Sequence, residues 1–283
     1  MTLALMKNTF CKLFFLSLLL FIQSLSHAYT RDVAITMDDL PFVGEAKNFH
    51  LDMIINTAKK EEIPLTGFVI ANQIEPNNWE MLEKFKNAGL SIGNHTLSHT
   101  NLNTTNTEAY IHEIDKADKI LAPVITQPKY FRYPYLAEGK GDKKQRVLQF
   151  LADKNYHVAP VTIDSKDFIF NQLLLSVPQN ERRAFLNVLK PCYLAFIWQQ
   201  TIKAEANDKA QGKLGRPQIL LIHSNLLNAY VLPDIIALYR ENHFNFISLN
   251  AALKTDENTQ FAMAKKRKAP ANEHFVENEM SWD

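Results

Sequence analysis

From about residue 33 onward, short apolar segments rich in β-branched and aromatic residues alternate with longer segments of helical periodicity. This alternation is typical of repeated strand–helix units wound around a mostly parallel sheet. Seven segments have the composition of strands: Val33–Asp38, Leu65–Ile70, Leu90–Asn94, Tyr130–Arg132, His157–Ile163, Ile219–His223 and Phe246–Leu249. Polar residues gather at their downstream ends, where parallel α/β folds place their active sites, so functional residues are expected there.

The first 28 residues have the features of a cleaved signal peptide. Lys7 and Lys12 flank the apolar run Leu13–Ile22, and small residues precede a cleavage point after Ala28. The run has about half the length of a membrane-spanning helix, so an N-terminal anchor is the alternative and no stable membrane span is expected after cleavage. We therefore expect a periplasmic or secreted protein. The glycosylation acceptor at Asn94 falls inside a candidate metal motif, which favours a bacterial source.

The charge balance argues against nucleic-acid binding. The chain has 31 Lys and Arg residues against 30 Asp and Glu residues. It therefore lacks the broad positive field of nucleic-acid-binding proteins, and no nucleic-acid partner is expected. Of the two cysteines, Cys11 leaves with the signal peptide, and Cys192 alone cannot form an internal disulfide.

The connection from residue 171 to residue 217 is too long for a simple crossover and must contain structure of its own. Apolar residues recur in it at helical spacing: Leu186, Leu189, Tyr193, Phe196 and Ile197. We expect a helical insertion packed on the sheet, with Cys192 as a small buried hydrophobic residue; a lid that shapes substrate access is the alternative. The polar segment 254–283 is expected to be a solvated tail without assigned function.

Two polar clusters could bind a metal ion. Asp38 and Asp39 end the first strand, and both can enter one site only if the backbone bends at Asp39, because adjacent strand residues face opposite sides. The alternative is ordinary turn chemistry before Pro41. His95 and His99 have the i, i+4 spacing that places two imidazoles on one face of a helical turn, and two histidines with one carboxylate suit a catalytic zinc ion.

Three further clusters offer acid–base chemistry. Arg132 ends a strand before an aromatic–proline turn and could hold a carboxylate ionised through a bidentate pair. His223 follows an apolar strand, and Asp167 could orient its imidazole and raise its pKa, as a general acid requires. The structural alternatives are a strand-ending proline turn with packed tyrosines and a histidine satisfied in the core.

Five motifs appear in the order of the polysaccharide deacetylase family, also called NodB homology or carbohydrate esterase family 4. They are Thr36-Met37-Asp38-Asp39, His95-Thr96-Leu97-Ser98-His99, Arg132-Tyr133-Pro134-Tyr135, Asp164-Ser165-Lys166-Asp167-Phe168 and Leu221-Ile222-His223. The chain thus resembles this family from residue 36 to residue 223. The resemblance implies an α/β fold, a distorted (β/α) barrel of seven to eight strands spanning residues 29–253, and a divalent metal, usually Zn²⁺ with Co²⁺ as an alternative.

The resemblance also implies a role for each motif residue. Asp38 would be the general base held by Arg132, and His223 the general acid oriented by Asp167. Asp39, His95 and His99 would be the metal ligands. The N–H of Tyr135 would bind the oxyanion and Leu221 would line the acetyl pocket, with Pro134 and Phe168 also on the substrate side.

The implied activity is hydrolysis of N-acetyl or O-acetyl groups of a polysaccharide, with release of acetate. The near-neutral charge is consistent with an uncharged acetylated glycan. A catalytically silent glycan-binding module and a metal hydrolase of a non-sugar amide or ester are the alternatives. Leu40 replaces the family's glycine and is expected to narrow the groove. Ser224-Asn225 replaces a common aspartate after His223, which affects the expected hydrogen bonding there.

Overall fold

The computed structural model describes residues 30–255, so the expected signal peptide and all but the first two residues of the tail 254–283 lie outside the described part. Within residues 30–255, no helix is long and apolar enough to cross a membrane.

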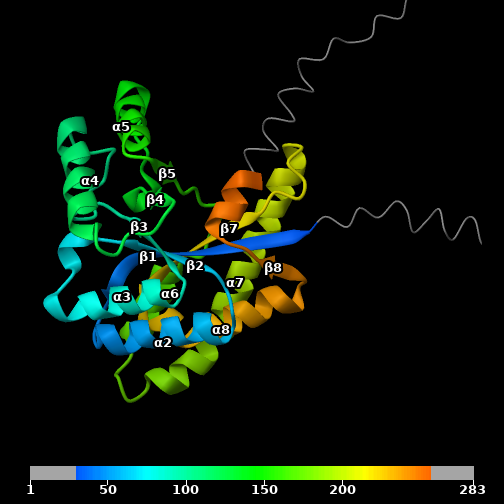
Figure 1. Ribbon diagram of the computed structural model, residues 1–283. Helices are drawn as coiled ribbons and strands as arrows, with labels where there is room; N and C mark the ends of the chain where they lie inside the picture. Colours follow the sequence, from blue (N-terminus) through cyan, green and yellow to red (C-terminus); the bar gives the residue numbers. More distant parts are fainter. Residues whose placement is uncertain (1–29, 256–283) are drawn as a thin grey trace, which may run out of the picture. The chain divides into compact units, whose positions relative to one another are not determined.

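The strands form one parallel sheet with the longest strand near its centre (Figure 1). The bounds are β1 Arg31–Val43, β2 Leu65–Val69, β3 Ser91–Asn94, β4 Lys129–Phe131, β5 Tyr156–Val158, β6 Ile163–Asp164, β7 Gln218–Asn225 and β8 Phe244–Phe246. Their order is β5-β4-β3-β2-β1-β7-β6, and β8 pairs with β1. Because every pairing is parallel, the carboxyl ends of the strands meet at one rim.

The sheet is curled into a distorted, open barrel. Its two edge strands, β5 and β6, are separated in sequence by only residues 159–162. Such a link reaches at most about 17 Å, whereas a flat sheet of seven strands would hold its edges about 29 Å apart. The sheet must therefore curve until its edges approach each other, as the sequence resemblance implied.

Two strand expectations were wrong. The segment Phe246–Leu249 overlaps β8 only at Phe246, because the strand begins at Phe244 and Leu249 is already helical. The segment His157–Ile163 was expected to be a single strand, but it forms β5 and β6 at opposite edges of the sheet. Pro160 lies between the two strands and has no N–H to continue a ladder, which accounts for the break.

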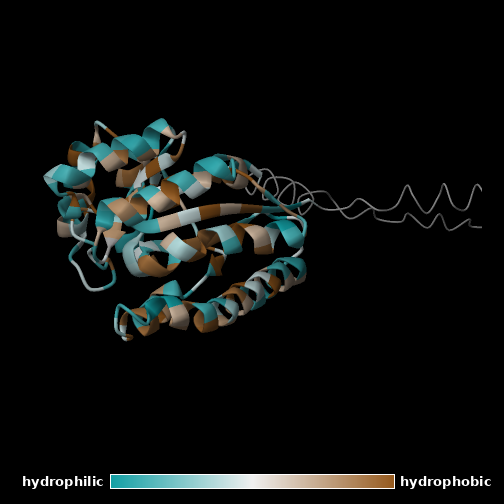
Figure 2. Cartoon of the chain, turned by 90° about the horizontal axis from the view of Figure 1, so that it is seen from below, coloured by the Kyte–Doolittle hydropathy of each residue, from teal (hydrophilic) through white to brown (hydrophobic). Residues whose placement is uncertain are grey.

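Helices cover the outside of the sheet. The bounds are α2 Lys47–Lys60, α3 Trp79–Asn87, α4 Thr107–Leu121, α5 Gly141–Asp153, α6 Asp167–Leu175, α7 Arg182–Ala210 and α8 Leu226–Glu241. Figure 1 shows α2 beside α8, and α4 beside α5 at the opposite side of the sheet. In Figure 2 many of the residues on β1 are hydrophobic, while the helices around the sheet carry long hydrophilic stretches. The fully buried residues Val33, Ile35 and Met37 of β1 belong to the main core.

The insertion is helical, as expected, and contains the end of α6 and the whole of α7. Leu189, Tyr193 and Ile197 follow each other at intervals of four residues and are buried in the main core. Cys192 was expected to be buried, but it is exposed. It lies one position away from Tyr193 on the helix and therefore about 100° from the core-facing stripe.

Candidate active site

An irregularity within β1 brings two adjacent carboxylates into one cavity. The backbone bends at Asp39, which has φ 64°, and the register between β1 and β2 shifts between Met37 and Leu40. The bend expected at Asp39 is therefore present. Asp38 and Asp39 both line a cavity of about 570 Å³ at the rim of the sheet.

Leu40 does not narrow this cavity, contrary to expectation. Its side chain is fully buried, and a Cβ added to Gly67 on the neighbouring strand would meet the Leu40 methyl groups at 2.8 Å. The left-handed backbone position falls on Asp39, and Leu40 points into the core.

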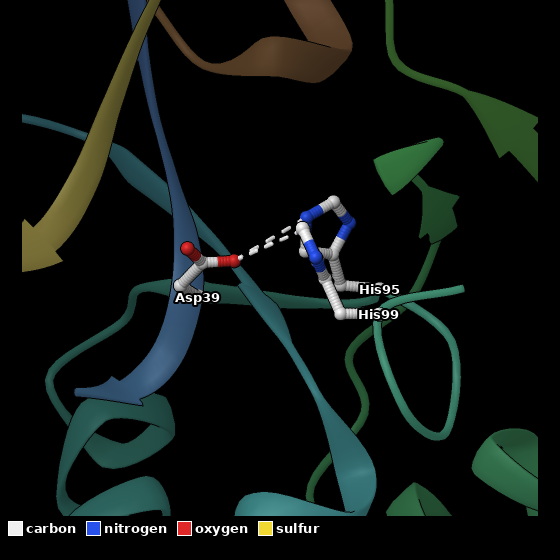
Figure 3. A group of neighbouring side chains, drawn as sticks. All are labelled: Asp39, His95 and His99. Carbon is white, nitrogen blue, oxygen red and sulfur yellow. Dashed lines mark ion pairs between the residues drawn. The ribbon is translucent and has the colours of Figure 1, made fainter. Parts of the chain in front are cut away.

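His95, His99 and Asp39 point toward one another, as Figure 3 shows. The Nε2 atoms of His95 and His99 lie 3.6 Å and 3.5 Å from the same oxygen, Oδ1 of Asp39. The histidines come from an irregular loop after β3, in which Thr96 and His99 have positive φ, and not from the expected helical turn. The loop still brings both imidazoles to one point. The prediction that the two histidines lie together was therefore correct, but the helical turn on which it was based is absent.

These three side chains fit a divalent cation. Their donor atoms all lie within 4.8 Å of one another, and Oδ1 of Asp39 is buried without a hydrogen-bond partner. Nδ1 of His95 lies 2.9 Å from the carbonyl oxygen of Arg132, so the Nδ1–H donates there and Nε2 keeps its lone pair for a ligand. Burial lowers the pKa of His95 to about 3, which holds the imidazole in the neutral form that binds metals.

Asp38 is a buried carboxylate beside the guanidinium of Arg132. Nη1 of Arg132 lies 3.5 Å from Oδ1 of Asp38, while Nη2 donates to Oγ1 of Thr36 at 3.0 Å. The expected bidentate pair is therefore absent, because the guanidinium divides its donors among Asp38, Thr36 and the carbonyl oxygen of Pro160. Burial raises the pKa of Asp38, and the charge of Arg132 opposes that rise. The carboxyl group is thus more basic than an exposed aspartate, which suits a proton acceptor.

On β7, in register with Asp38 of the neighbouring β1, His223 forms a charged pair with the fully buried Asp167. Nδ1 of His223 lies 2.6 Å from Oδ1 of Asp167. Burial alone would lower the pKa of His223, but the carboxylate of Asp167 outweighs it and raises the pKa to about 9. The same pairing lowers the pKa of Asp167 despite its burial. At neutral pH, therefore, His223 carries a proton next to the cavity.

Two asparagines hold Asp167: Asn225, which belongs to the departure after His223, and Asn228, which the sequence did not indicate. Its Oδ2 accepts from the N–H of His223 at 2.7 Å, from Nδ2 of Asn225 at 2.9 Å and from Nδ2 of Asn228. The Oδ1 of Asn225 also caps α8 by accepting from the N–H of Asn228. Asn225, which stands in the segment where Ser224-Asn225 replaces the family's aspartate, therefore donates a hydrogen bond to the Asp167–His223 pair. An asparagine between a strand and a helix is a capping signal that could have pointed to it.

Three of the four expected substrate-side residues line the cavity. Tyr135 is 66% exposed, and its ring centroid lies 4.5 Å from that of His99. Phe168 lies edge-on to His223, and Leu221 forms a buried part of the wall. Pro134 is buried and does not line the cavity, so its placement on the substrate side was wrong.

Known proteins resemble this chain over part of its length. The family model for polysaccharide deacetylase matches residues 27–159. A probable peptidoglycan-N-acetylglucosamine deacetylase of Arthroderma benhamiae is 37% identical over 141 residues, which cover 48% of this chain and 30% of that protein. A peptidoglycan-N-acetylglucosamine deacetylase of Bacillus cereus is 29% identical over 140 residues, covering 48% and 46%. The chain therefore spans about a third to a half of the length of these relatives.

Solved structures share the fold. A peptidoglycan deacetylase of Bacillus subtilis has a TM-score of 0.57 at 17% identity, covering 85% of this chain and 98% of that chain. A carbohydrate esterase family 4 pseudoenzyme of Bacillus anthracis has a TM-score of 0.54 at 17% identity, covering 77% and 64%. At these identities the likeness establishes the architecture alone. The family-model match ends before Asp167 and His223, so the geometry of the site is what links them to the first three motifs.

Proposed function

Because the chain belongs to the polysaccharide deacetylase family, we propose that it is a metal-dependent hydrolase that removes acetyl groups from an acetylated glycan. One observation carries the proposal. The buried base candidate Asp38 and the protonated His223 line the same cavity as the Asp39, His95 and His99 trio. A proton acceptor, a proton donor and a cation site are the groups that metal-assisted hydrolysis of an amide uses.

Asp39, His95 and His99 would hold the cation. When bound, a divalent ion such as Zn²⁺ polarises a carbonyl group and makes an adjoining water molecule more acidic. Zinc suits two imidazoles and one carboxylate, and Co²⁺ is the alternative.

The residues of the chain would carry the proton transfers. Asp38 accepts a proton from the attacking water, because burial makes its carboxylate more basic. His223 donates its proton to the leaving nitrogen of the sugar and is held for that step by Asp167. The N–H of Tyr135 would donate to the oxyanion, and the Leu221 side chain would contact the acetyl methyl group.

The test is acetate release by the purified protein. We expect release from at least one of acetylated chito-oligosaccharides, peptidoglycan and acetyl-xylan, and loss of that release on chelation with recovery on addition of Zn²⁺. Acetate release that persists in the metal-free protein would contradict the proposal.

Two other functions stand as outcomes of the same assay. A catalytically silent glycan-binding module would bind zinc and glycan but release no acetate, and the Bacillus anthracis structural relative is described as a pseudoenzyme. A hydrolase of a non-sugar amide or ester would act only on small synthetic acetyl substrates. The separate acid and base positions in this chain favour the glycan deacetylase over the silent module.

We also propose that the protein acts in the periplasm or outside the cell, on the basis of the charged and apolar pattern of residues 1–28. N-terminal sequencing of protein from the expressing cell should begin at Tyr29. A sequence that begins at Met1 would contradict cleavage.

A further inference from the structure

A second cavity lies beside the catalytic one and is larger, at about 850 Å³. We call it the insertion cavity. Leu175, at the end of α6, lines both cavities, so the two share a wall. Eight of the fourteen residues that line the insertion cavity come from the segment 171–217, and the others come from the β1–α2 connection, α2 and α8. The volume falls in the range of cavities that bind small organic ligands.

The lining of the insertion cavity has an excess of positive charge. The exposed Arg183 has no ion pair or hydrogen bond within the described part of the chain. Arg182 donates to the carbonyl oxygens of Val177 at 3.1 Å and Leu175 at 3.4 Å, which leaves its charge uncompensated.

The other charged groups of the lining do not cancel this excess. Lys190 is paired with Asp234 at 2.7 Å, and Glu45 is the one acidic residue among those that line the cavity. Two guanidinium groups therefore face one unpaired carboxylate, and the lining favours an anion.

Part of the lining of the insertion cavity is aromatic. His50 is buried, stacks on Phe42 with ring centroids 5.3 Å apart, and meets Tyr230 edge-on at 6.0 Å. Nδ1 of His50 lies 3.0 Å from the carbonyl oxygen of Glu45, which fixes the ring. Tyr230 is 45% exposed and presents an amphipathic ring to the cavity. A cavity lined by both aromatic rings and arginines matches a ligand with an apolar ring face and an acidic group.

We propose that the insertion cavity is a subsite for a sugar that carries a carboxylate and lies a short distance along the polymer from the residue being deacetylated. The substrate class would then be an acidic acetylated glycan, and this inference rests on the proposed deacetylase function. Arg183 would bind the carboxylate of the sugar, because its guanidinium is free to donate two hydrogen bonds to it. The near-neutral total charge conceals this local excess.

Two soluble polymers with the same acetylated backbone test the proposal: carboxymethyl chitin, which is acidic, and glycol chitin, which is neutral. We expect kcat/KM to be about threefold to fivefold higher on the acidic polymer, the scale of an exposed ion pair. The difference should lie mainly in KM and shrink in high salt, because salt screens exposed charges.

Arg183→Glu should abolish or reverse this ratio. Lys203→Glu is the matched control, because Lys203 is an exposed lysine on the same helix, outside the cavity and about 30 Å along the axis from residue 183. It makes the same charge change and should keep the wild-type ratio. Arg182 is unsuitable for the test, since its hydrogen bonds close the turn between α6 and α7.

Calorimetric binding of both polymers by the full chain separates this inference from the proposed function. Tighter binding of carboxymethyl chitin that is lost in Arg183→Glu supports the subsite even if no acetate is released, whereas absence of acetate overturns the deacetylase activity alone. Equal binding and equal kcat/KM on the two polymers, or the same ratio in Arg183→Glu and Lys203→Glu, overturns the subsite.

Discussion

At the scale of single residues, Asp38 is deeply buried, and its Oδ1 lies 3.5 Å from Nη1 of Arg132. Asp38→Asn keeps the shape of the side chain and removes its ability to accept a proton. We expect kcat to fall by about 10²–10⁴-fold, the usual contribution of a general base, with zinc binding retained. Acetate release and metal content measured on the same preparation check this. Full turnover in the variant would remove Asp38 from the role of base.

The pH profile follows from the two shifted groups. Asp38 must be ionised, and its raised pKa places the acidic limb of kcat/KM above the usual range of an aspartate. His223 must be protonated, so activity is retained below its pKa and declines as the pH rises through about 9. We expect a bell-shaped profile with its alkaline limb near that value.

Asp167→Asn should shift the alkaline limb. Without the carboxylate, burial dominates and the pKa of His223 falls, so activity is lost at lower pH than in the wild type. Phe168→Leu changes an uncharged neighbour of the same ring and should leave the limb in place. An identical alkaline limb in Asp167→Asn and wild type would show that His223 does not govern it.

At the scale of elements, two glycines allow neighbouring strands and side chains to pack closely. A Cβ at Gly67 would meet the flexible end of Leu40 at 2.8 Å, whereas one at Gly93 would meet the backbone oxygen of Tyr130 at 2.8 Å and the ring of Phe68. Gly67→Ala should destabilise the fold by about 1–3 kcal/mol through overpacking, and less in a Leu40→Ala background.

Gly93→Ala should find no such relief, because a backbone carbonyl cannot withdraw without disturbing the pairing of β3 and β4. Urea unfolding of the single and double variants measures both effects. Equal costs of Gly67→Ala with and without Leu40→Ala would argue that Leu40 is not the obstacle.

The sequence predicted the elements best where periodicity and side-chain type agreed. Apolar runs located the strands that carry Asp38 and His223, and helical spacing located the insertion, but β1 continues to Val43 and β7 to Asn225, past the expected ends. Backbone geometry was less accessible: the histidine pair lies on a loop with positive φ, and nothing in the spacing distinguishes that loop from a helical turn. The direction of Leu40 depends on packing against Gly67, a contact between strands that residue patterns do not reveal.

The supports of the site were the hardest to foresee. Asn228 binds Asp167 from 61 positions away in sequence, and its role depends on where α8 begins. Similarly, His95 is oriented by a backbone carbonyl, which carries no side-chain signature. Such partners become visible only once the fold is known.

At the scale of the whole molecule, a bound cation should stabilise the fold because its three ligands come from two separate segments of the chain. A free Zn²⁺ concentration of one hundred times its Kd adds about 2.7 kcal/mol to the free energy of unfolding. We expect thermal unfolding to shift upward with Zn²⁺ in the wild type and in Asp38→Asn, but not in His99→Ala. A zinc-dependent shift that survives in His99→Ala would place the ion elsewhere.

The four-residue link between β5 and β6 joins edges that no hydrogen-bonded ladder connects, so the number of residues in it controls how widely the rim stands open. Arg132 extends to this link, since its Nη2 lies 3.4 Å from the carbonyl oxygen of Pro160. Two glycines inserted beside Pro160 should cost little stability, because lengthening a loop is inexpensive. The same insertion should lower kcat by releasing the guanidinium beside Asp38, as unfolding and turnover measured together would reveal. The shortest link from one strand to the next would then act as a spacer of the barrel, setting the distance between the base and the opposite wall of the cavity.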